Sequence, residues 1–515
     1  MNPARLVALA VLVAFAATAA DAAAVDDPPA GLVRSASTLA KVRALYERAH
    51  ARERAHPGTV IEEWRLAEDH LVGTHRVRRS GNDQRETIVL GPFTSEQGLH
   101  AGVFWQQTRN GLTYTYTGFH QIRDEVSTRA WETAEPDRYV RLAGDSVPYN
   151  AYVVEINPPN GRHEWRFIDK GTGYVVRTER VLKRRRYVTT YDDYRIFDGT
   201  PEPSHVRTVD SNGNDRDETL LSRTLDLSAD PHDLDIPPSR RNLVEFPAST
   251  SFVRLPVHIV NGLLVVRVAI GTRSYDFLLD SGAAGIVIDP TIADEGKFDR
   301  YGTRVGSTLG TYTETASILP QMLVGPLRLR NVVVRVVPVP FVIDERTRIV
   351  GLLGFDFFAD SIVHLDIARG VVDVIAPPAF RPPAEAVAVP LALDDRTPDV
   401  RARIGGVPGR VVIDTGANRS VFTTAFAGRA DVTTEGAGNT RFRAMGGIGT
   451  AAVVRIKQFE LAGIDQTDQL VDVTSADFAS EDVDGTVGTD LLHPCELYFD
   501  YRANTLYVRH TRAAT

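Results

Sequence analysis

The order of apolar and polar residues divides the chain into regions of different periodicity. Over residues 36–56, apolar side chains recur every three or four positions, which predicts one amphipathic helix. Over residues 60–227, short runs such as Thr113–Tyr116 alternate between the two residue types, and turn sequences such as Asn110-Gly111 separate them. We therefore expect an antiparallel half-barrel sheet with one helix, followed by further β structure.

Two proline-rich segments mark breaks between sheets, because proline cannot donate to a sheet ladder. The first lies around Pro237-Pro238, and the second spans residues 376–384. The pattern predicts a mainly β chain of four parts. These are a signal peptide at 1–24, an antiparallel β accessory domain at 30–235, and two β lobes at 250–376 and 385–515.

The two lobes repeat one another at a constant offset. Residues 277–283 read FLLDSGA and residues 411–417 read VVIDTGA, so the offset between Asp280 and Asp414 is 414 − 280 = 134. In each copy a Gly-x-x-Gly begins at the same spacing after the aspartate (351 − 280 = 71 and 485 − 414 = 71). Asp-Ser/Thr-Gly alone is a weak signal, but this compound pattern found twice in the same order indicates a duplicated fold.

This pattern, over roughly residues 252–508, resembles the aspartic-protease superfamily, and the compact lobes resemble its retroviral (retropepsin-like) type. The resemblance implies that Asp280 and Asp414 are the catalytic carboxylates, one taking a proton from water and the other supplying one to the substrate carbonyl. It also implies that the lobes grip each other through hydroxyls. The expected catalytic-loop support residues are Ser281, Gly282, Thr415 and Gly416.

A glycine-rich segment in the second lobe is similar to the tip of a retroviral-type flap, where glycines permit a tight turn and a close approach to substrate. The expected flap residues are Met445, Gly446, Gly447, Ile448 and Gly449. The matching region of the first lobe, residues 306–312, is poorer in glycine, and Tyr312 there is either a flap tyrosine or a strand residue, of which we favour the strand.

The residues after the two catalytic-loop glycines are Ala283 and Ala417. Pepsin-like members often carry a hydroxyl there, which hydrogen-bonds the carboxylate and lowers its pKa. Alanine cannot do so. We therefore expect a pH optimum milder than that of pepsin-like enzymes.

The N-terminal half has a second, more diffuse resemblance. One helix beside a meandering sheet is similar to the half-barrel of bacterial lipoprotein carriers. The run Tyr191–Arg195, followed by Asp198-Gly199 and Pro203, adds to it. This resemblance implies a lipid or lipoprotein as a partner of the N-terminal domain.

Composition and short sequence motifs limit the partners, location and cofactors that we expect. A net charge of −8 argues against a nucleic-acid partner. The apolar run Leu6–Ala17, followed by Ala-x-Ala sequences, resembles a signal peptide too short to span a membrane, and Cys495 is the single cysteine. We expect a bacterial protein that is periplasmic or secreted, with no membrane span. No metal or phosphate-binding motif occurs in the sequence, so we expect no cofactor.

Three functions remain open at the level of sequence. The first is an exported aspartic endopeptidase that hydrolyses peptide or protein substrates through a water held between Asp280 and Asp414. The second is a catalytically silent peptide-binding module. The third is a periplasmic lipid or lipoprotein carrier that uses the N-terminal domain. The lobes could also pair between chains, although the linker at 376–384 is long enough for pairing within one.

Overall fold

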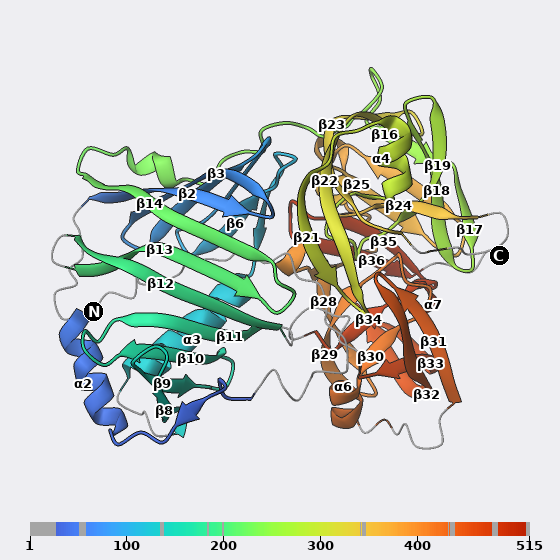
Figure 1. Cartoon of the computed structure of the whole chain (residues 1–515). Coiled ribbons are helices and arrows are strands. Elements are labelled where there is room, and N and C mark those ends of the chain that lie inside the picture. The colour runs from blue at the N-terminus through green and yellow to red at the C-terminus, as the bar shows by residue number, and fades with distance from the viewer. Residues whose placement is uncertain are drawn as a thin grey trace. The chain divides into compact units, whose positions relative to one another are not determined.

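The computed structural model of the chain describes most of its residues, which fold into two compact units (Figure 1). Unit 1 comprises the described residues of Ala20–Trp105 and Gly118–Ile236, and unit 2 those of Gln106–Thr117 and Pro237–Thr515. Residues 106–117 thus pack with unit 2, although they lie within the 30–235 range assigned above to the first domain. The described residues are 27–50, 58–133, 138–182, 185–197, 200–339, 341, 347–430, 432, 438–475 and 483–510. The segment interpreted as a signal peptide lies outside them.

The strands of unit 1 lie in a fourteen-stranded sheet in the order β1-β8-β9-β10-β11-β12-β13-β14-β2-β3-β4-β5-β6-β7, whose last strand belongs to the segment 106–117. Pairing follows chain order except where β1 joins β8 and β14 joins β2, as expected of a meander. The strands are β1 (Leu32–Val33), β2 (Thr59–Glu68), β3 (Leu71–Ser80), β4 (Asp83–Leu90), β5 (Phe93–His100), β6 (Val103–Gln107), β7 (Thr113–Tyr116), β8 (Val140–Ser146), β9 (Ala151–Ile156), β10 (His163–Asp169), β11 (Val175–Leu182), β12 (Arg185–Phe197), β13 (Thr200–Asp210) and β14 (Asp215–Asp226).

Two helices pack on this sheet. Helix α2 spans Leu39–His50, the central part of the predicted helix, and the predicted residues 51–57 lie outside the described ones. Helix α3, Phe119–Glu132, was not predicted, because it buries little along its length and its apolar residues form no clear stripe. Val42 of α2 and Trp131 of α3 share one apolar cluster with strands β8–β10. The strand residues of this cluster are Val140, Val154, Ile156 and Ile168.

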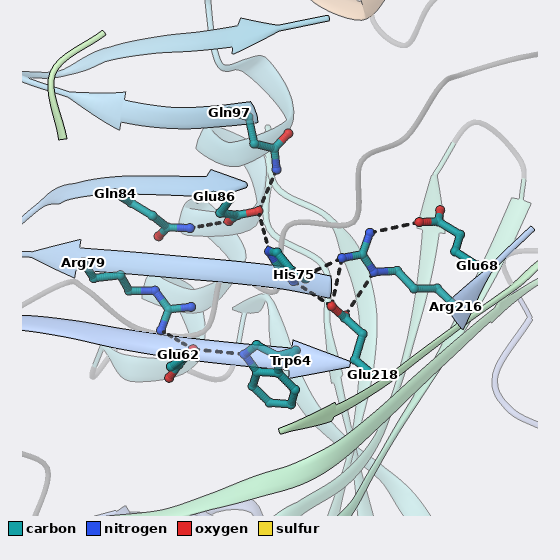
Figure 2. Close-up of polar contacts among 10 residues, drawn as sticks. All are labelled: Glu62, Trp64, Glu68, His75, Arg79, Gln84, Glu86, Gln97, Arg216 and Glu218. Atoms are coloured by element: carbon teal, nitrogen blue, oxygen red, sulfur yellow. Dashed lines mark hydrogen bonds and ion pairs between the residues drawn. The ribbon is translucent and has the colours of Figure 1, made fainter. Parts of the chain in front are cut away.

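Farther along the same sheet, strands β2–β5 and β14 bury a network of charged side chains (Figure 2). The His75 ring contacts the Glu218 carboxylate at 2.7 Å and the Glu86 carboxylate at 3.3 Å, and Arg216 binds Glu218 at 2.9 Å. Burial alone would lower the pKa of His75, but hydrogen bonds and charges of the two glutamates raise it to about 9. His75 is therefore protonated at neutral pH.

Unit 2 contains three sheets, with strand orders β15-β23-β20-β24-β19-β18-β22-β21, β16-β26-β25-β35-β36-β27 and β28-β29-β34-β30-β33-β32-β31. Strand β17 joins the first sheet through β18. The first-half elements are the 3-10 helix η2 (Pro231–Leu234, at the end of unit 1), β15 (Val244–Glu245), β16 (Phe252–Leu255), β17 (Val257–Val260), β18 (Leu263–Ile270), β19 (Arg273–Leu279), β20 (Val287–Ile288), α4 (Pro290–Gly296), β21 (Tyr301–Ser307), β22 (Thr311–Val324), β23 (Leu327–Val336), β24 (Ile349–Leu353), α5 (Phe355–Ala359), β25 (Ile362–Asp366) and β26 (Val371–Ile375).

The second half of unit 2 repeats most of these elements. They are η3 (Pro377–Ala379), β27 (Val387–Pro390), η4 (Asp394–Arg396), β28 (Asp399–Ile404), β29 (Val407–Ile413), β30 (Val421–Thr423), α6 (Thr424–Arg429), β31 (Gly438–Ala444), β32 (Gly447–Leu461), β33 (Ile464–Thr474), β34 (Gly485–Val487), α7 (Thr489–Leu492), β35 (Cys495–Asp500) and β36 (Thr505–His510).

The duplication is visible in the strand pairing. Strands β19 and β24 pair in parallel with Leu278 opposite Leu352, and β29 and β34 pair in parallel with Val412 opposite Thr486. The repeat offset relates the two pairs (412 − 278 = 134 and 486 − 352 = 134). In the middle sheet, His364 of β25 pairs with Tyr498 of β35 (498 − 364 = 134). A pseudo-two-fold axis therefore passes between these two strands, and the predicted bilobal, mainly β fold is confirmed.

Candidate active site

Asp280 and Asp414 each follow the last residue of a buried strand, β19 and β29. Both are held by the same backbone contact. The Asp280 N–H donates to the Leu353 carbonyl at 3.0 Å, and the Asp414 N–H donates to the Val487 carbonyl at 3.0 Å. The apolar residues before each aspartate are buried in the core, so each loop starts from a fixed strand end.

Reciprocal hydrogen bonds join the two loops. The Ser281 hydroxyl donates to the Ile413 carbonyl at 2.7 Å and accepts from the Thr415 N–H at 3.1 Å. The Thr415 hydroxyl donates to the Leu279 carbonyl at 2.7 Å and accepts from the Ser281 N–H at 3.0 Å. Both hydroxyls are fully buried, so four bonds shielded from water fix one loop against the other.

The two carboxyl groups lie between these loops. A Cβ built on Gly282 would come within 2.6–2.9 Å of the Asp414 carboxyl group, and one on Gly416 would come within 2.4–2.7 Å of that of Asp280. Only glycine leaves room for this approach. The two carboxyls are close enough for each to shift the pKa of the other, and Asp414 accepts the Gly416 N–H at 2.8 Å.

The environment favours one shared proton. Burial raises the pKa of both carboxyls, and the charge of Asp414 raises the pKa of Asp280 further. The hydrogen bond to Asp280 and the backbone N–H groups of Gly416 and Ala417 lower the pKa of Asp414 in opposition to burial. These effects favour Asp280 over Asp414 as the holder of the shared proton.

Two hairpin tips meet elsewhere in unit 2. Met445 and Gly446 form the two-residue turn between β31 and β32, with φ +80° at Gly446, and residues 308–310 join β21 to β22. A Cβ on Gly446 would lie 2.2 Å from the Gly310 carbonyl oxygen, and one on Gly447 would lie 3.1 Å from that of Leu309. Both lobes thus carry such a hairpin. Ile448 and Gly449 begin β32, and Tyr312 lies in β22, as interpreted from the sequence.

One residue near the aspartates escaped the sequence reasoning. Tyr501 follows β35 and is 1% exposed, and its hydroxyl has no hydrogen-bond partner among the described residues. Burial and the charges of Asp280 and Asp414 raise its pKa. The repeat offset would have drawn attention to Tyr501, because the two copies differ there: the first copy has Ile367 at the matching position.

The described part of the chain contains no group of three or more His, Cys, Asp or Glu side chains that could hold a metal ion. No helix there is both long and apolar enough to cross a membrane. Cys495 is buried, which raises the pKa of its thiol to about 12 and makes it a poor nucleophile.

Comparison with known proteins places the repeat in context. No curated protein matches the chain. Basic 7S globulin from soybean, a solved structure, is similar over 51% of this chain and 95% of its own, with 12% identity and a TM-score of 0.33. A family model described as aspartyl protease matches residues 266–357 and again residues 400–491, and the two matches are related by the repeat offset (400 − 266 = 134 and 491 − 357 = 134). Each match contains one of the two aspartates, so each lobe is similar in sequence to an aspartyl protease domain.

Proposed function

We propose that the chain is an exported aspartic endopeptidase of the retroviral type, with both lobes in one chain. The observation that carries the proposal is the pair of half-buried carboxyls, each of which lies against the loop of the other at the ends of equivalent strands. The family model supports an aspartic-protease activity, and a hairpin in each lobe favours the retroviral type. Export rests on the apolar run at residues 6–17 alone.

The geometry suggests a role for each carboxyl. A water between them would give a proton to the Asp414 carboxylate while its oxygen attacks the peptide carbonyl carbon, and Asp280 would give its proton to the carbonyl oxygen. The resulting diol would collapse as the C–N bond breaks, with the nitrogen taking a proton from Asp414 and Asp280 recovering its own from the diol. The locked loops keep both groups in place throughout.

The two alternatives have less support. A silent peptide-binding module would not need both carboxyls, yet burying two acidic groups side by side costs stability. A lipid carrier needs an apolar groove. The described strands β2–β5 and β14 instead bury the charged network around His75 on a face of the sheet (Figure 2).

Peptide cleavage by single variants tests the proposal. Asp280→Asn and Asp414→Asn should each lower kcat by about 100-fold or more, because each removes one half of the acid–base pair. Asp468→Asn is a matched control, since this side chain is 75% exposed on β33. Full activity in either dyad variant would refute the proposal. Peptide binding without turnover by the wild type would support the silent module.

A further inference from the structure

The two copies hold an equivalent aspartate in different ways. In the second lobe, Asp490 in the first turn of α7 accepts the Ser420 N–H at 2.9 Å and the Ser420 hydroxyl at 2.6 Å. The same hydroxyl accepts the Gly488 N–H at 2.9 Å. The repeat offset places Asp356 and Ile286 at these positions in the first lobe. The Ile286 N–H still bonds Asp356, but isoleucine has no hydroxyl, so the first lobe cannot make the second contact from this position.

A segment from far upstream occupies that place. We call residues Gln106–Thr117 the strap; they pack with unit 2 although their neighbours in sequence belong to unit 1. The Thr108 hydroxyl of the strap donates to Asp356 at 3.4 Å. Burial raises the pKa of Asp356, and the charge of Arg396 and the hydrogen bonds from Asn110 and Thr108 oppose that rise. Asp356 is 4% exposed, so this pairing offsets part of the cost of its burial.

The strap is firmly anchored. The Asn110 side chain bridges the backbone of Val333, accepting its N–H at 2.8 Å and donating to its carbonyl at 2.9 Å. Leu112 and Tyr114 are buried in the main apolar core of unit 2, and the Tyr114 ring lies 4.7 Å from that of Phe355. A segment with two core residues and a bidentate backbone contact is part of the fold it enters.

The strap also bears on the Asp280 loop. Asp356 follows Phe355, whose N–H donates to the Ala283 carbonyl at 2.9 Å, and the nearby Leu353 carbonyl accepts the Asp280 N–H. We infer that Thr108 and Asn110 are positioning residues for Asp280, supplying to the first lobe what Ser420 supplies to the second. The strap is then a built-in part of the catalytic unit. A cleavage that released residues 106–117 would therefore remove part of the first lobe. This inference rests on the proposed function.

A double-mutant cycle in the full-length chain tests the inference. Thr108→Val removes the hydroxyl at nearly constant volume, and Ile286→Ser offers the first lobe a hydroxyl of its own. We expect Thr108→Val to lower kcat by up to about 100-fold with little change in KM, since misplacement of a reacting group costs rate. In the Ile286→Ser background the same substitution should cost much less. Thr190→Val, on β12 of unit 1, is the matched control.

The urea midpoint of unfolding provides a readout that does not depend on activity. If the wild type cleaves no peptide, the proposed function fails, while the cycle in urea midpoint still tests the strap. Coupling between the two substitutions in kcat, or in midpoint where no cleavage occurs, supports the inference. Additive effects, or a Thr108→Val variant with wild-type kcat and midpoint, would overturn it.

Discussion

At the scale of single residues, the candidate site depends on groups that the sequence already shows and on others that it hides. Ser281 and Thr415 differ, yet each places a hydroxyl where it can bind the opposite loop. Their partners are backbone carbonyls of the other copy, which sequence cannot specify. Thr108 and Tyr501 carry no motif at all. They lie near the site only because the chain folds back on itself.

Ala283 and Ala417 have no hydroxyl that could lower the pKa of the two aspartates, which leads to a prediction about the pH dependence of activity. Activity requires one proton on the pair, so the acid limb follows binding of a second proton to the pair and the alkaline limb follows loss of the shared proton. Both pKa values are raised, which moves both limbs to higher pH than ordinary carboxyls would give. We expect a maximum well above pH 3, measured as kcat/KM against pH. A maximum below about pH 3 would contradict this assignment.

A substitution sharpens the same prediction. Ala417→Ser adds a hydroxyl that can donate to the Asp414 carboxylate, which lowers the pKa of that group and should move the acid limb to lower pH. Ala388→Ser, on the exposed strand β27, serves as the control and should leave the profile unchanged.

At the scale of elements, the hairpins were predicted unequally. Glycines in residues 445–449 marked the second one, whereas the first has a three-residue turn with a single glycine, Gly310. Turn chemistry is local and can be read from sequence, but contact between two turns that belong to different lobes cannot. For the same reason helix α3 escaped notice, because it is recognised by what it packs against rather than by its own pattern.

Two glycines, Gly446 and Gly463, allow the effect of strain in a turn to be measured apart from the effect of contact between hairpin tips. Gly446 and Gly463 have φ values of +80° and +79°, but only the first lies against another hairpin; a Cβ on Gly463 would meet nothing within 4 Å. The positive φ alone should make alanine at either position cost about 1 kcal/mol of unfolding free energy, and at Gly446 the close approach of the Cβ to the Gly310 carbonyl adds to that cost. We expect Gly446→Ala alone to lower kcat/KM for peptides, because the tips can no longer close together. Equal kcat/KM in the two variants would argue against a flap.

At the scale of the whole molecule, both aspartates come from a single chain and a single unit. The middle sheet explains this, since β25 of one lobe pairs directly with β35 of the other. The linker at residues 376–384 joins the two lobes within one chain. No second chain is needed to bring Asp280 and Asp414 together.

Mixing two inactive variants tests whether the pair forms within one chain. If the dyad is intrachain, combining Asp280→Asn with Asp414→Asn chains should restore no activity, even after joint refolding. If lobes exchanged between chains, a fraction of the mixture would regain an intact pair. Specific activity of the wild type should likewise stay constant on dilution, measured by initial rates of peptide cleavage.

The sequence by itself determined the duplication and the two aspartates. A tight loop that follows a buried strand tolerates few residue types, so it leaves a local sequence pattern, and this pattern occurs in both copies. Pairing of the two copies into one site followed from their equivalence. Only the tertiary structure decided that residues 106–117 belong with unit 2 and that Thr108 completes what Ile286 lacks. Such contacts join residues that are far apart in the chain, and the free energy of burying them together leaves no periodic trace in the sequence.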